Sequence, residues 1–68
     1  MNYPRVRWDR SANAASIDLG ESSGPRRGLP VEDGDGNVVA VLRFSPEGEL
    51  VEVELLEADV QLPKIFRD

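Results

Sequence analysis

VVAVLRFSPEGELVEVELL, residues Val38 to Leu56, decides the fold, because it joins two strand-like runs through a recognisable turn. The turn is SPEG, residues 45–48. Proline holds its φ angle near about −65°, which suits the second position of a type I turn, and glycine adopts the left-handed conformation that closes a three-residue loop with a bulge. The stretch therefore predicts a β-hairpin over residues 38–56.

The turn also predicts which residues face each other. If the ladder is regular, Phe44 pairs with Leu50, Arg43 with Val51, and each step outward pairs the next two residues. One face, the predicted core, then carries Val39, Val41, Arg43, Val51, Val53 and Leu55. The other face, which we call the mixed face, carries Val38, Ala40, Leu42, Phe44, Leu50, Glu52, Glu54 and Leu56.

The mixed face is too apolar to leave in water and too charged to form a dry core. An apolar patch interleaved with charge is typical of a protein interface, so we predict an interface at these residues. The alternative is cover from the same chain. In that case the first hairpin or the C-terminal tail lies on this face, and the glutamate stems lie flat with their carboxylates in water.

The remaining chain predicts one more hairpin. Val6 and Trp8 alternate with arginines, residues 9–13 are turn formers, and Ala15, Ile17 and Leu19 share one face of a second strand. Residues 20–37 are rich in glycine and predict a mobile polar loop, with room for a short edge strand near residues 29–32.

The tail, residues 57–68, predicts one helical turn over residues 57–61, ended by Pro63. Ile65 and Phe66 are expected to dock onto the sheet or onto a neighbour. The fold class predicted for the single domain, residues 1–68, is mainly β. It is a four-stranded antiparallel meander of two β-hairpins, residues 5–19 and 38–56, with a short C-terminal helical turn or an extended tail.

Size and composition point to association with another chain. A domain of 68 residues has a core that supplies only about 3–5 kcal/mol, and this chain has no cysteine with which to add disulfides. We therefore predict a homo-oligomer, with a dimer favoured. The net charge of −5 opposes binding to nucleic acid by this domain alone or to an anionic membrane, and allows a basic protein partner. The chain lacks a signal-like or membrane-spanning segment, which predicts a soluble cytoplasmic protein.

No residue pattern predicts chemistry. DGDGN, residues 33–37, matches the opening of a calcium loop, but position twelve is Phe44 instead of glutamate and the following segment is a strand. We interpret it as a polar turn. The chain has no histidine, and its carboxylates have no evident pocket, so we predict no catalytic, cofactor-binding or metal-binding residues and no enzyme. Arg26 and Arg27 either hold an anion or keep the loop solvated. Arg5 and Arg7 are expected to lie across from acidic residues of the main hairpin.

Two segments resemble a known family. WDRSANAASIDL, residues 8–19, and FSPEGELVEVELLEA, residues 44–58, resemble the Y-D-x-E-A-D-A-L-Y-I-x-L opening and the Y-D-E-D-G-x-I-V-G-I-E-I-L-D-A ending of domain of unknown function family 2283, a small bacterial and archaeal domain. Four positions depart from its pattern, namely Asn13, Ala15, Ser16 and Ser45. The resemblance implies a compact antiparallel sheet with no established catalytic residues. Some relatives look like small partners encoded beside toxin-like proteins.

Two functions are therefore expected. The first is a non-enzymatic interaction module that self-associates through the mixed face. The alternative is an acidic antitoxin-like partner that neutralises a basic protein through an acidic ridge, which consists of Glu49, Glu52, Glu54 and Glu57.

Overall fold

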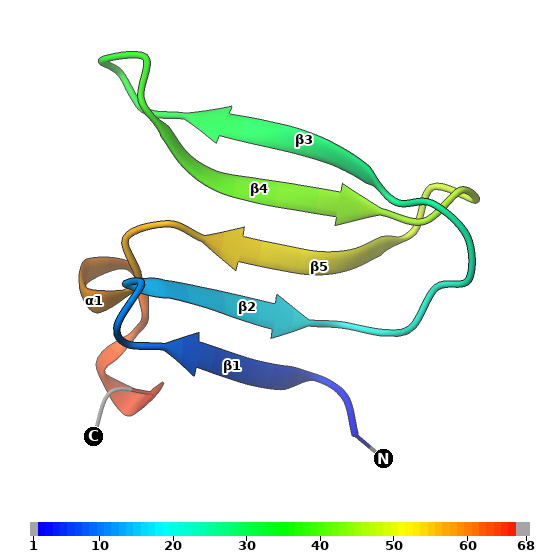
Figure 1. Cartoon of the computed structure of the whole chain (residues 1–68), viewed down its shortest axis with the longest axis horizontal. Helices are drawn as coiled ribbons and strands as arrows, with labels where there is room; N and C mark the ends of the chain where they lie inside the picture. Colours follow the sequence, from blue (N-terminus) through cyan, green and yellow to red (C-terminus); the bar gives the residue numbers. More distant parts are fainter. Residues whose placement is uncertain (1, 67–68) are drawn as a thin grey trace.

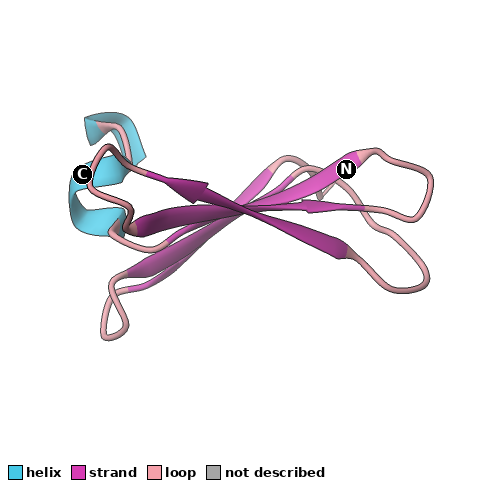
Figure 2. Cartoon of the chain, turned by 90° about the horizontal axis from the view of Figure 1, so that it is seen from above, coloured by secondary structure: helices cyan, strands magenta, loops and turns pink. Residues whose placement is uncertain are grey.

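The computed structural model describes residues 2–66 and shows a mainly β fold (Figure 1). Its strands are β1 (Arg5–Asp9), β2 (Ala14–Asp18), β3 (Arg27–Glu32), β4 (Val38–Phe44) and β5 (Leu50–Leu55), followed by helix α1 (Ala58–Gln61) and the 3₁₀ turn η1 (Lys64–Phe66). The strands form one sheet in the order β1-β2-β5-β4-β3, and all neighbouring pairs are antiparallel. Figure 2 shows a single twisted layer with the helical segments at one end.

The predicted antiparallel sheet and both hairpins are confirmed, whereas the four-stranded meander is wrong. Strand β3 lies inside the predicted polar loop, and β2 pairs with β5 and not with β4. Gly28 and Pro30 made this segment resemble a loop. An edge strand tolerates proline because one side of its backbone donates no ladder hydrogen bonds, and β3 is an edge strand.

The turn of the main hairpin forms as predicted, but the predicted register is wrong beyond its first pair. The Gly48 amide donates to the Ser45 carbonyl at 2.9 Å, and Gly48 has a φ of 94°. Phe44 faces Leu50 as expected, but the next residue of β4, Arg43, faces Glu52. Residue 51 is therefore an extra residue on β5, which makes a β-bulge.

The bulge changes which side chains share a face, because a one-residue shift moves every later side chain to the other side. Glu52 lies beside Arg43, and Val53 lies beside Leu42. A regular ladder would instead have placed Glu52 beside Leu42. The bulge thus separates the acidic and apolar residues of the predicted mixed face onto opposite sides of the sheet.

The C-terminal segment covers one corner of the sheet. Ala58 and Leu62 are fully buried against Ala15, with Trp8 and other partly buried side chains around them. The predicted helical turn is confirmed. Asn13, in the β1–β2 turn, has a φ of 52° and fixes the helix: its side-chain oxygen accepts the Asp59 amide at 2.9 Å.

Candidate interaction surface

The sheet has two chemically different faces, which follow from the strand pairing. One, the charged face, consists of Arg5, Arg7, Asp18, Arg43, Glu52 and Glu54. The other, the open apolar face, consists of Ile17, Leu29, Val31, Leu42, Phe44 and Val53. It is called open because the C-terminal segment covers only its neighbours at the corner of β1, β2 and β5.

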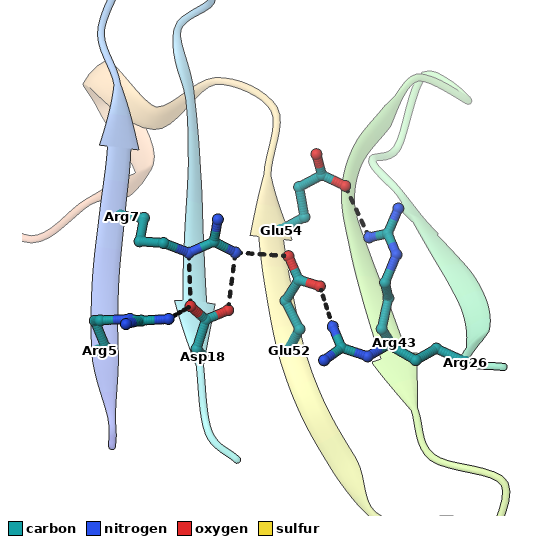
Figure 3. A network of polar contacts seen from close by, with 7 residues as sticks. All are labelled: Arg5, Arg7, Asp18, Arg26, Arg43, Glu52 and Glu54. Atoms are coloured by element: carbon teal, nitrogen blue, oxygen red, sulfur yellow. Dashed lines mark hydrogen bonds and ion pairs between the residues drawn. The ribbon is translucent and has the colours of Figure 1, made fainter. Parts of the chain in front are cut away.

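Arg7 is the centre of the charged face (Figure 3). Its guanidinium donates two hydrogen bonds to Asp18, from Nε at 2.6 Å and from Nη2 at 3.1 Å. The same Nη2 lies 3.7 Å from Glu52 on β5. Asp18 and Glu52 are direct cross-strand neighbours with like charge, so Arg7 bridges two carboxylates that otherwise repel each other.

Further arginines complete the network from both sides. Arg5 lies 3.5 Å from Asp18, and Arg26, which precedes β3, donates to Glu52 at 3.1 Å. Arg43 donates to Glu54 at 2.8 Å. The expected contact between strand β1 and the acids of the main hairpin is therefore present, through Arg7 and Glu52.

This network buries its acids. Asp18 is 5% exposed and Glu52 is 8% exposed, because arginine stems lie over them. The hydrogen bonds from Arg7 hold the pKa of the Asp18 carboxyl below its usual range, opposed by partial desolvation. A general acid needs the opposite shift, so the arrangement favours structural ion pairing over proton transfer.

The open apolar face is less buried than these charged residues. Ile17, Leu42 and Val53 are only half-buried, and Leu29 on the edge strand is 54% exposed. A depression of about 290 Å³ lies at its β3 side, lined by Arg27, Gly28, Leu29 and Phe44. The apolar face therefore lacks the cover that the charged face receives from its own arginines.

The structure divides the predicted interface between the two faces. Ala40, Leu42 and Phe44 lie on the apolar side, with Leu50 paired to Phe44. Glu52 and Glu54 lie on the charged face, so these residues do not form one surface. Val38 is exposed at the start of β4, and Leu56 is half-buried after β5.

Sequence reasoning missed the apolar residues that the other strands contribute. Val53 was assigned to the predicted core face, Ile17 to one face of the first hairpin, and Leu29 and Val31 to a loop with room for a short edge strand. The signal that could have corrected this is complementary charge. Glu52 and Glu54 alternate with Val53 on one strand, and Arg5 and Arg7 alternate with Val6 on another, so acids and bases meet when these residues share a face of the sheet.

The other candidate residues have local structural partners. Asp33 accepts backbone amides of Asp35 and Asn37 at 2.8 and 3.0 Å, which confirms a polar turn and lowers the pKa of Asp33. Arg26 binds Glu52, whereas the Arg27 side chain makes no ion pair or hydrogen bond with residues 2–66. Among residues 2–66, no three His, Cys, Asp or Glu side chains are placed to hold a metal ion. No helix within that range is long and apolar enough to span a membrane.

Comparison with known proteins gives no relative from which a role can be transferred. No family model, no curated protein and no solved structure matches this chain. The resemblance to domain of unknown function family 2283 remains a prediction.

Proposed function

We propose that this protein is a non-enzymatic, cytoplasmic interaction module that forms a homodimer through its open apolar face. The observation that carries the proposal is an inverted burial pattern. Two carboxylates at the centre of the sheet are almost completely buried, whereas Ile17, Leu42 and Val53 behind them are half-buried. A sheet with one apolar face is stable when a second layer covers it, and this chain supplies only one corner of that layer.

A second copy suits this face in size and chemistry. The two longer dimensions of the molecule are 33 and 31 Å, a projected area on the order of 1,000 Å², and a standard interface buries about 800 Å² per partner. The face is almost free of charge, so an identical face is an apolar partner for it. Two such sheets pack face to face as a sandwich about 10 Å apart, related by a two-fold axis.

Sedimentation equilibrium of the wild type and of Leu29→Glu tests the proposal. The wild type is expected to be a dimer, and Leu29→Glu is expected to weaken dimerisation at least tenfold, about 1.4 kcal/mol, because it buries a carboxylate in the interface. Leu29 is 54% exposed, so the variant keeps its fold. Pro30→Glu, the neighbouring position on the opposite face, is the matched control and leaves the dimer intact. A wild type that stays monomeric at high concentration rules the proposal out.

The antitoxin-like alternative depends on an acidic ridge, half of which is already engaged. Glu52 pairs with Arg7 and Arg26, and Glu54 pairs with Arg43. Among the described residues, Glu49 and Glu57 are the two members of that ridge without a cationic partner. The geometry thus favours self-association over neutralisation of a basic protein.

A further inference from the structure

The open apolar face is not level, and its shape restricts how a second copy fits. The C-terminal segment from Ala58 to Phe66 stands at the corner formed by β1, β2 and β5. Strand β3 lies at the opposite edge of the sheet (Figure 1). Each molecule therefore has a raised corner at one edge and an uncovered strip at the other.

The raised corner carries apolar side chains that its own sheet does not use. Leu62 points inward and is 1% exposed, whereas Ile65 is 78% exposed and Phe66 is 49% exposed. The prediction that Ile65 and Phe66 dock onto the sheet of their own chain is not met for Ile65. Contact with a neighbour is the alternative that remains.

The uncovered strip offers a matching receptor. The depression of about 290 Å³ is lined by Arg27, Gly28, Leu29 and Phe44, and the Arg27 side chain has no ion pair or hydrogen bond within the described residues. Two apolar side chains and an arginine in the lining suit an aromatic ring, because a cation over an aromatic face is attracted to it.

We infer that, in the proposed dimer, the two copies face each other with their strands crossed, so that the raised corner of each lies over the diagonally opposite corner of the other. Phe66 of one copy enters the depression at Leu29, Phe44 and Arg27 of the other, and the reverse contact follows by symmetry. The other orientation stacks one raised corner on the other, which holds the two sheets apart and leaves both strips uncovered. This inference rests on the proposed homodimer and adds the orientation of its partners.

Cysteine cross-linking tests the orientation cleanly, because the chain has no cysteine. Leu29→Cys and Phe66→Cys proteins are mixed in equal amounts, oxidised, and resolved on a non-reducing gel with mass spectrometry. A mixed disulfide between the two variants is expected, with little product from either variant alone. Mixing Phe66→Cys with Asp35→Cys, which lies in the β3–β4 turn at the opposite end of these strands from Phe44, is the control and gives no such product.

The outcomes separate the orientation from the dimer itself. A dimer in sedimentation that cross-links only through Leu29→Cys with itself, or not at all, overturns the orientation and leaves the homodimer standing. A monomer in sedimentation overturns both. As a second measurement, Phe66→Ala is expected to weaken dimerisation about tenfold, whereas Lys64→Ala on the same 3₁₀ turn leaves it unchanged.

Discussion

The two faces of the sheet are completed in different ways. The charged face is closed by arginines of the same chain, which cover Asp18 and Glu52 until both are buried. The apolar face is closed at one corner only, by Ala58 and Leu62. The difference shows that long arginine side chains can cover the face of a sheet without a second layer of structure. Short aliphatic side chains need such a layer to be buried.

The largest effect is expected where the apolar face is closed. Leu62→Ala removes the largest fully buried apolar side chain and leaves a cavity, so we expect a loss of about 2–4 kcal/mol in the free energy of unfolding. Urea denaturation followed by circular dichroism measures it. Val60→Ala, on the exposed side of the same helix, is the control and changes stability by less than about 0.5 kcal/mol. Equal effects of the two changes would contradict the described packing.

The next effect concerns the centre of the charged face. Arg7→Gln leaves two buried carboxylates facing each other, and we expect a loss of about 1–2 kcal/mol, discounted because the Arg7 side chain is partly exposed. That corresponds to a fall of roughly 5–15 °C in Tm for a domain of this size. Arg7→Lys should lose about half as much stability, because lysine keeps the positive charge but cannot donate two parallel hydrogen bonds to Asp18 as the guanidinium does. Arg27→Gln, measured on the dilute monomer, is the control, since the Arg27 side chain has no ion pair or hydrogen bond with residues 2–66. A comparable loss there would refute the bridging role.

A smaller effect is expected from pH. The folded-state pKa of Asp18 is lowered by Arg7, so its contribution to stability is present above the unfolded pKa of about 3.9 and is lost as pH falls through the folded pKa. The urea midpoint is therefore expected to fall between about pH 5 and 2. Asp18→Asn should flatten this dependence but not abolish it, because the pKa values of Asp9 and Asp33 are lowered as well. An unchanged slope would count against the ion pair.

The smallest effect is expected at the open strip. Leu29→Ser removes an exposed leucine, so the stability of the dilute monomer should change by less than about 0.5 kcal/mol. Thermal melts over a range of protein concentrations separate this from the dimer, because only the wild type gains stability with concentration. If Leu29→Ser destabilises the dilute monomer strongly, this strip is covered by the chain itself.

Local rules of the sequence predicted the local structure well. The SPEG turn, the first hairpin and the helical turn before Pro63 depend on residues a few positions apart, and all three form. A short edge strand near residues 29–32 was allowed but was not counted in the predicted fold, because Gly28 and Pro30 oppose a strand locally and only an edge position makes them acceptable.

The candidate surface was harder to predict, because it depends on contacts between distant strands. The bulge at Val51 leaves no local mark in the sequence. It places Glu52 on the face where Arg7 from β1 and Arg26 from outside the hairpin contact it. The assignment of residues to faces therefore followed an incorrect register even though the turn was correct.

Val51 also determines how the length of this chain can vary. The face that a side chain occupies depends on whether an odd or even number of residues separates it from the turn. Deletion of Val51 itself would leave Glu52 opposite Arg43, since the extra residue is the one removed. Deletion of Val53 would bring an acid next to Leu42 with or without the bulge. Across the main hairpin, a deletion of one residue thus keeps the pairing at residue 51 and changes it at residue 53, because only the bulge can absorb a change in the residue count.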